Sequence, residues 1–430
     1  MESWNSTNYR KLYSQQSCRR PCYCCNATFF VFLLFAPLVF VLWLLWFIFS
    51  VLFGLLAAIF CHPKWLSEFC RDILRKEVGP EEEKELNERM PKSYRSNAQH
   101  SAPPPADPTR PHHTTEGVVK ARLKIDESIP AEFRLGVFSQ PGEYQAVARL
   151  SGASFGNHGL AVKLWGVPDS VAGPSIFFSD EARTWEEEEK MQATRYPDST
   201  HEMDFLTVAV RLGFLAKNIR ELAWATDFGN KDLSFCSRMR ILLYLPSWYI
   251  LFRGLQCKLV ADSQLPALNP SSWSFFSVAP FKLGESVVKY HFLPDQPNAM
   301  APGCASSSPT QLLNESLKKG DVSFGLYVQF QPKDKQKYNI ENVWDMWCDR
   351  ENPLFRCGTL TIPGGQDAMS PESAELGQTL WFNPWFTSAT HAPLGQFNRV
   401  RHRSYIAVGA IRERRLGRDS PPQCPFFRAA

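Results

Sequence analysis

Residues 144–151 read YQAVARLS, and residues 160–167 read LAVKLWGV. Apolar side chains dominate both stretches and Gly and Pro close them, which is typical of β-strands. The stretch VVKARLKID at 118–126 alternates apolar and polar residues through Val119, Ala121, Leu123 and Ile125. The same pattern returns in SVVKYHFLP, VSFGLYVQFQP and FRCGTLTIP, at residues 286–294, 322–332 and 355–363. The sequence therefore predicts a strand-rich barrel.

Between and after these strands the pattern changes to a helical one. Residues 204–228 and 236–255 are expected to be helical, and so is the stretch FNRVRHRSYIAVGAIRERR at 397–415. The acidic residues 185–190 are expected to form a loop or a solvated helix. The sum is a mixed α+β domain in which helices surround the barrel.

The overall composition bounds the class of protein. The chain has 430 residues, 47 basic and 43 acidic, with a formal net charge of +4. This balance is too even for nucleic acid as a partner, because a phosphate backbone requires a concentrated basic face. The length is sufficient for one large or two ordinary domains that fold without disulfide bonds.

Residues 21–61 contain no Asp, Glu, Lys or Arg, and residues 29–60 are mostly apolar. Because a bilayer core requires only about 20 helical residues, this segment is long enough for an N-terminal transmembrane helix with tilt or a bend at Pro37. A re-entrant hairpin is the alternative. Membrane lipid is therefore an expected partner.

The basic residues that flank the apolar segment do not decide on which side of the membrane the domain lies. Four basic residues precede the apolar segment and four follow it: Arg10, Lys11, Arg19, Arg20, Lys64, Arg71, Arg75 and Lys76. Residues 1–28 form a Cys-rich tail whose thiols are acylated, inert or, least favoured, metal-binding. The later cysteines lack disulfide-framework spacing, which favours a reducing compartment on the cytosolic face.

The remaining chain divides by composition. Residues 61–110 are expected to hold a juxtamembrane helix, a solvated charge run at 81–88 and a Pro-rich linker. The folded domain is expected at residues 111–415, and residues 416–430 form a flexible tail.

Three segments carry residues that are unusual for a structural core. His112 and His113 precede the first expected strand and suit acid/base work or metal ligation, although two exposed linker histidines are the simpler interpretation. Arg149 lies near the end of an apolar strand, where a buried guanidinium requires an anion. Arg401 and Tyr405 stand at i, i+4 on an expected helix. A guanidinium one turn from a phenol favours the phenolate, which is a hard ligand for ferric iron.

Taken together, these segments resemble the heme catalase superfamily, and more closely its smaller catalase-like members. ARLS resembles the family's R-F-S, and HGLAVKLWG resembles R-G-x-A-x-K-F. The other matching segments are DFL, LTIP, FNPW and PLGQFNRVRHRSY. In chain order the six segments occupy residues 148–151, 158–166, 204–206, 360–363, 382–385 and 393–405. The resemblance covers roughly residues 111–415 and implies an antiparallel β-barrel with surrounding helices.

The resemblance implies heme b as cofactor, with Tyr405 as the iron ligand and Arg401 holding it as phenolate. It implies that Arg149 pairs with a heme propionate and that Phe214 contacts the cofactor. The distal histidine is His112 or His113: the spacing of classical catalases favours His113, and that of the smaller relatives favours His112. Ser151 would orient this histidine, which would act as general base and acid on a peroxide.

Two departures from the family pattern bear on activity. Ala209 stands where a distal Asn is usual, and His158 replaces the Arg of the R-G-x-A-x-K-F segment. We therefore expect a membrane-anchored, heme-dependent peroxidase-like oxidoreductase or hydroperoxide isomerase that acts on organic or lipid hydroperoxides. A heme- or lipid-binding sensor or scaffold without turnover is the alternative. By the resemblance, a homo-oligomer is also expected.

Overall fold

The computed structural model describes residues 41, 44–48, 78–99, 113–153, 158–167, 202–209, 216, 218–228, 230, 232–234, 269–295, 308–331, 339–343, 347, 349–380 and 382–416. Most of the apolar segment 29–60, and the segments 61–77, 185–190 and 236–255, lie outside these residues. Within the described residues, no helix is both long and apolar enough to cross a membrane.

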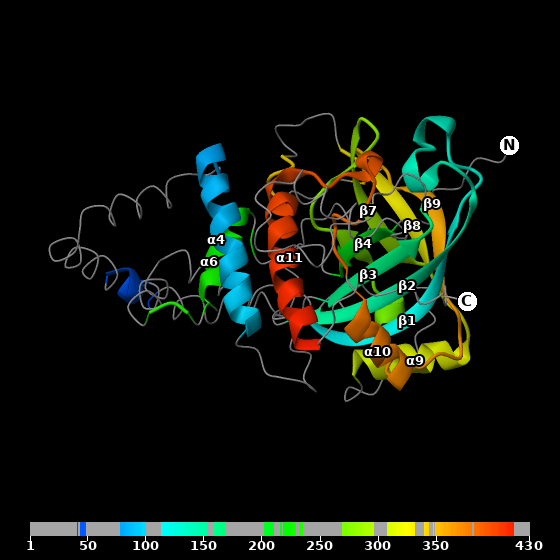
Figure 1. The fold of residues 1–430 in the computed structure, drawn as a ribbon. Helices are drawn as coiled ribbons and strands as arrows, with labels where there is room; N and C mark the ends of the chain where they lie inside the picture. Colours follow the sequence, from blue (N-terminus) through cyan, green and yellow to red (C-terminus); the bar gives the residue numbers. More distant parts are fainter. Residues whose placement is uncertain are drawn as a thin grey trace.

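One antiparallel sheet dominates the described residues (Figure 1). Its strands are β1 (His113–Ile125), β2 (Gly142–Ala153), β3 (His158–Trp165), β4 (Glu202–Val208), β5 (Phe275–Ser277), β6 (Phe281–Leu283), β7 (Ser286–Pro294), β8 (Val322–Phe330) and β9 (Phe355–Ile362). The spatial order is β5-β4-β3-β2-β1-β9-β8-β7-β6. An additional pairing of β5 with β7 closes eight of these strands into a barrel, with β6 attached beside β7. The expected barrel is confirmed.

The interior of the barrel is filled by the alternating apolar positions of the strands. The positions expected from β1, Val119, Ala121, Leu123 and Ile125, are all buried. Aromatic rings pack edge to face at the centre, with ring centroids 4.9 Å apart for Phe205 and Tyr290. Such pairs stabilise a core beyond the area they bury. Every second residue of these strands is therefore apolar because it points into the barrel interior.

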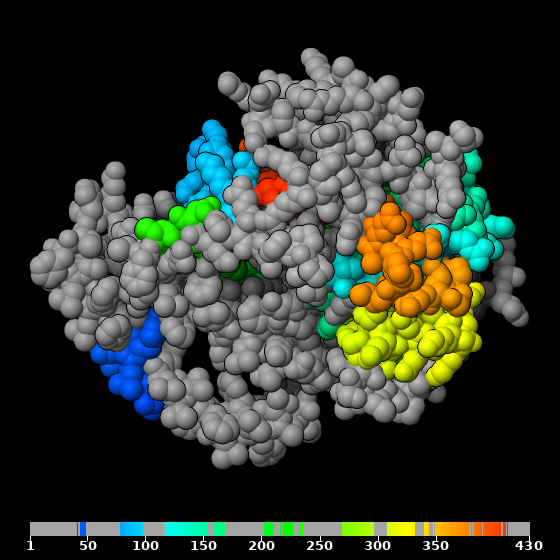
Figure 2. Space-filling view, turned by 60° about the horizontal axis from the view of Figure 1, so that its bottom comes forward, coloured from blue at the N-terminus to red at the C-terminus, as the bar shows by residue number. Residues whose placement is uncertain are grey.

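Helices cover the outside of the barrel on two sides. The helix α11 (Gly395–Leu416) lies between the barrel and the pair α4 (Pro80–Gln99) and α6 (Ile219–Phe228), as Figure 1 shows. The short helices α9 (Pro309–Lys319) and α10 (Pro371–Thr379) lie side by side on another face, over β1 (Figure 2). The expectation of surrounding helices is confirmed, and residues 397–415 are helical as predicted.

Two sequence expectations differ from the structure. The first part of residues 204–228 is the strand β4, and helix α6 begins only at Ile219. The charge run at 81–88 belongs to the longer helix α4, which is not fully solvated: Leu86 and Met90 are buried in a cluster shared with α6 and α11. Part of the segment 61–110, expected to precede the folded domain, is therefore packed against it.

A buried histidine connects three parts of the barrel rim. The N–H of Val137 donates to Nε2 of His391 at 3.0 Å, so the ring proton lies on Nδ1 and faces the Tyr290 hydroxyl 2.7 Å away. The Tyr290 hydroxyl in turn donates to the carbonyl of Lys282 at 3.2 Å. Gly136, at φ +53°, leaves the space that the imidazole fills. His391 is fully buried, and this burial lowers its pKa to about 4.

We expect His391 to make the fold sensitive to acid. Its pKa is about 4 when folded and about 6.5 when unfolded, so its contribution is present above pH 6.5 and is lost as pH falls through 4. The full loss is about 3 kcal/mol, at about 1.4 kcal/mol per pKa unit. The free energy of unfolding of His391→Gln, measured between pH 7 and pH 4.5, should fall less with acid than that of the natural chain. Equal slopes for the two proteins would contradict this assignment.

Candidate functional site

The pair Arg401 and Tyr405 lies on helix α11. Nη2 of Arg401 donates to the Tyr405 hydroxyl oxygen at 3.0 Å, and the guanidinium carbon is 5.2 Å from the phenol ring centroid. The i, i+4 contact expected from the sequence is therefore confirmed. Both residues are partly buried. The guanidinium thus lies against the phenol oxygen and holds its position.

A second phenol lies near this pair. Tyr94 of α4 packs beside the cluster formed by α4, α6 and α11. Burial raises the pKa of Tyr94 to about 12, and the electrostatic effects of Tyr405 and Arg401 act on it in opposite directions. Tyr94 therefore stays protonated at neutral pH next to the candidate ligand. No feature of the sequence pointed to this neighbour, because it comes from a helix that was expected to be solvated.

Arg149 and Ser151 lie on the outward face of β2. Alternate residues of β2 enter the barrel core, where Ala148 and Leu150 are buried, so Arg149 and Ser151 point the other way. Nε of Arg149 donates to Oγ1 of Thr115 at 3.4 Å. Its Nη2 is buried and has no hydrogen-bond partner within the described part of the chain. A buried guanidinium nitrogen without an acceptor is costly, and an anion at this position would complete its hydrogen bonds.

Ser151 lies opposite a glycine. The register pairs Thr115 of β1 with Ser151 and Ser151 with Gly159 of β3. A Cβ on Gly159 would come within 2.8 Å of Oγ of Ser151, so only glycine leaves this hydroxyl its present position. Two residues further along the same ladder, the backbone of His113 pairs with Ala153. Ser151 therefore lies near the strand end that carries the expected distal histidines.

Three of the expected site residues lie beyond what the structure can place. His112 and Phe214 are outside the described residues, and of His113 only the backbone is described. The roles expected for them stay predictions. The two departures from the family pattern are placed: Ala209 is buried, and its N–H donates to the carbonyl of His158 at 2.7 Å. The His158 ring lies 4.4 Å from that of Trp273.

A buried ammonium was not identified as a site from the sequence. Lys163 of β3 is 2% exposed and forms ion pairs with Glu202 at 2.7 Å and Asp204 at 2.9 Å. Burial raises the pKa of Asp204 to about 7, although Lys163 acts against this shift. Burial alone would lower the pKa of Lys163, but the two carboxylates raise it. A lysine within the apolar run LAVKLW was the signal that could have shown a buried ion pair.

Residues 382–388, named here the strap, cross the barrel face above this ion pair. The Asn383 N–H donates to Asp204 at 2.8 Å, and the Asp204 N–H donates to the Phe386 carbonyl at 2.8 Å. The Lys163 ammonium lies 4.4 Å from the centroid of the Phe386 ring. The segments HGLAVKLWG, DFL and FNPW, far apart in the sequence, therefore meet at one place.

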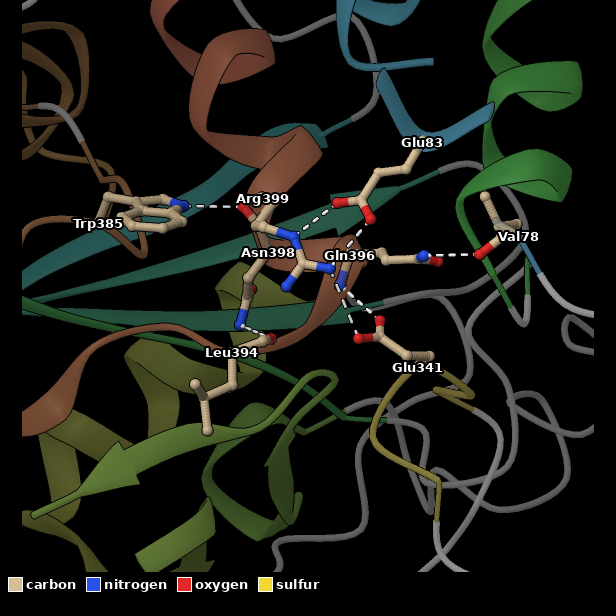
Figure 3. A network of polar contacts seen from close by, with 8 residues as sticks. All are labelled: Val78, Glu83, Glu341, Trp385, Leu394, Gln396, Asn398 and Arg399. Atoms are coloured by element: carbon tan, nitrogen blue, oxygen red, sulfur yellow. Dashed lines mark hydrogen bonds and ion pairs between the residues drawn. The ribbon is translucent and has the colours of Figure 1, made fainter. Parts of the chain in front are cut away.

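From the strap, contacts continue to the first turns of α11, where Figure 3 shows Trp385 beside Asn398. Nε1 of Trp385 donates to the carbonyl of Asn398 at 2.8 Å, and the Asn398 side chain accepts from Nη1 of Arg401 at 3.3 Å. On the other side of α11, Arg399 pairs with Glu83 of α4 at 2.6 Å. The helix that carries Tyr405 is thus held by the barrel on one side and by α4 on the other.

Two kinds of metal group can be compared with the residues that the structure describes. Among these residues no group of three or more His, Cys, Asp or Glu side chains is arranged to hold a metal ion. A porphyrin supplies four ligands of its own, so its iron would require only one side chain from the protein, such as Tyr405. A propionate would be an anion of the kind that the buried Nη2 of Arg149 could bind.

The comparisons with known proteins give structural likeness alone. No family model matches the chain, and no curated protein matches it significantly in sequence. The structure is similar to a fungal catalase (15% identity, TM-score 0.43), to catalase A from Saccharomyces cerevisiae (13%, 0.41) and to a bacterial catalase (14%, 0.44). The matches cover 69–73% of this chain and 56–59% of those chains, so the chain spans less than two thirds of their length.

We expect the Lys163 ion pairs to be required for a stable fold. Lys163→Leu leaves the buried carboxylate of Asp204 and the partly buried one of Glu202 without their cation, which typically costs about 3–5 kcal/mol. Denaturant unfolding monitored by tryptophan fluorescence measures the loss. The matched control is Lys120→Leu, which removes the exposed pair with Glu372 and should cost at most about 1 kcal/mol. Similar losses for the two variants would show that the buried pairs do not hold the strap.

Proposed function

We propose that this chain is a catalase-like heme protein in which Tyr405 is the axial iron ligand. The observation that carries the proposal is the hydrogen bond from Arg401 to the Tyr405 oxygen, which places a guanidinium beside this oxygen halfway along helix α11. The order of the sequence segments that resemble the family supports the same assignment. Heme b is the cofactor that this ligand and the barrel-with-helices architecture suit.

Arg149 is proposed to hold a heme propionate. Arg149 as a whole residue is 7% exposed, and its Nη2 is buried without an acceptor among the described residues. A carboxylate at this nitrogen would complete the hydrogen bonds of the guanidinium with the charge-assisted geometry that arginine favours. The outward face of β2 thus supplies the anion site, and α11 supplies the axial ligand.

The reaction that we propose is cleavage of the O–O bond of a peroxide or hydroperoxide. When bound, heme would supply the redox chemistry of O–O cleavage, with Tyr405 as the residue that would hold its iron. His113 or His112 is proposed to take and return the peroxide proton, and Ser151 to orient this histidine. Organic or lipid hydroperoxides are the proposed substrates, because the proposed anchor at residues 29–60 brings the domain to a source of apolar hydroperoxides. A cytosolic-facing domain and a homo-oligomer belong to the same proposal.

A second candidate function is heme or lipid binding without turnover, as in a sensor or scaffold. The observation that favours it concerns Ala209, which is buried and has no side-chain hydrogen-bond donor. Its backbone N–H already donates to the carbonyl of His158. A site without this donor lacks one preorganised hydrogen bond to a reacting peroxide. Such a loss typically lowers a rate by about 10²–10³.

We expect heme retention to depend on Tyr405. The full-length chain, purified in detergent after heme supplementation, should show a Soret band, and Tyr405→Phe should lose it because the ring is kept while the ligand oxygen is removed. The control is Tyr144→Phe, a partly buried tyrosine that packs against the barrel core. A Soret band of unchanged position and intensity in Tyr405→Phe would overturn the ligand assignment.

We expect Ala209→Asn to separate the two candidate functions. If the domain turns over hydroperoxides, the added donor should raise the rate with cumene hydroperoxide, by up to about 10². Stopped-flow absorbance measures this rate, and the unchanged Soret band of the variant is the control for heme content. No turnover in either the natural chain or Ala209→Asn, with heme bound in both, would favour the non-catalytic candidate.

A further inference from the structure

Asn398 is a fully buried amide in the first turn of α11. Its Nδ2 donates to two backbone carbonyls, that of Pro280 at 2.9 Å and that of Leu394 at 3.0 Å. Because only the NH₂ end of an amide can donate, these two acceptors fix which way the side chain is turned. The oxygen end, Oδ1, therefore points away from both carbonyls.

The oxygen end of Asn398 meets the arginine of the candidate ligand pair. Nη1 of Arg401 donates to Oδ1 of Asn398 at 3.3 Å, while Nη2 of the same guanidinium donates to Tyr405 at 3.0 Å. The two nitrogens belong to one planar fork, so fixing one of them fixes the direction of the other. Asn398 thus sets the plane in which Arg401 reaches the phenol oxygen.

The neighbouring polar residues of this turn make contacts elsewhere (Figure 3). Gln396 donates from Nε2 to the Val78 carbonyl at 2.9 Å, and Arg399 pairs with Glu83 and Glu341. Their side chains connect α11 to α4 and to residues 339–343. Asn398 is held to the barrel side instead, where the Trp385 indole also donates to its carbonyl.

We propose that Asn398 is a positioning residue that acts through Arg401 to hold the guanidinium on Tyr405, an inference that rests on the proposed function of Tyr405 as axial ligand. A neutral amide suits this role better than a carboxylate would. An aspartate in its place would compete with the phenol oxygen for the guanidinium charge, whereas the amide oxygen holds Nη1 without neutralising it. The barrel, through the carbonyl of Pro280, thereby sets the geometry of a ligand on the helix.

The test compares full-length variants in detergent after heme supplementation. Asn398→Leu removes the amide at nearly constant volume, and Asn398→Ser keeps a donor to the carbonyl four residues earlier but cannot reach Arg401. Both should change the iron–tyrosinate stretching band in the resonance Raman spectrum. Both should also raise the rate of heme transfer to apomyoglobin by about tenfold, as expected from the loss of one charge-assisted hydrogen bond. The Ser variant keeps the test valid if the Leu variant does not fold.

The matched control is Gln396→Leu, which exchanges another buried amide of the same turn for the same residue. It should lower the unfolding midpoint comparably but leave the Raman band and the heme-transfer rate unchanged. The double variant Asn398→Leu/Arg401→Leu tests the path of the effect: if Asn398 acts through Arg401, the double variant loses heme as fast as Arg401→Leu alone.

Three results separate failure of this inference from failure of the proposed function. Asn398 variants that match Gln396→Leu in every spectroscopic readout would overturn the positioning role. Additive effects of Asn398→Leu and Arg401→Leu on heme transfer would also overturn it. No Soret band in the natural chain, or one that persists in Tyr405→Phe, would instead overturn the assignment of Tyr405.

Discussion

The buried ammonium of Lys163 is the interaction on which the arrangement of the described residues depends. One cation pairs with two carboxylates from β4 and lies under an aromatic ring of the strap. Removing charges from water is costly, and the cost is offset only when each group finds its partners. The register of β3 on β4 and the path of residues 382–388 are therefore linked. A shift of the register, or a different path of the strap, would separate Lys163 from its partners. Through Trp385 and Asn398 the same constraint reaches the start of α11.

Helix α11 is held from two sides by different kinds of contact. Toward the barrel the contacts are buried hydrogen bonds of fixed direction, which involve Asn398 and Trp385. Toward α4 they combine the apolar packing of Phe397 and Val400 with an ion pair between Arg399 and Glu83. The ion pair is half exposed and contributes little to the free energy of unfolding, whereas the directional bonds define the orientation of the helix. The position of Tyr405 is thus set mainly from the barrel side.

The sequence predicted those features that depend only on residues close together in the chain. The alternation in β1 predicted a strand because the barrel interior selects every second residue, and the spacing of Arg401 and Tyr405 predicted their contact because a helix brings i and i+4 together. Strand β4, with the sequence EMDFLTV, also alternates at Met203 and Phe205, but it has only seven residues. It was assigned together with the residues up to 228 to one helical segment, of which only the last part, from Ile219, is helical.

Features that depend on distant segments could not be predicted in this way. The buried stripe of α4 is narrow, with Leu86 and Met90 among many charged residues, and nothing nearby shows what covers it. The orientation of Asn398 depends on the carbonyl of Pro280, more than a hundred residues earlier in the chain. The roles of His112, His113 and Phe214 stay predictions from resemblance.

The packing of α4 also changes the length of the tether to the proposed anchor. If the folded unit began at residue 111, residues 61–110 could let it travel up to about 170 Å from the end of the apolar segment. Because Val78 already packs with α4, α6 and α11, at most residues 61–77 could separate the packed residues from the proposed anchor, with a maximum reach of about 60 Å. If residues 29–60 are the anchor, as proposed, the domain would stay within about that distance of the bilayer, which raises its effective concentration at the membrane surface.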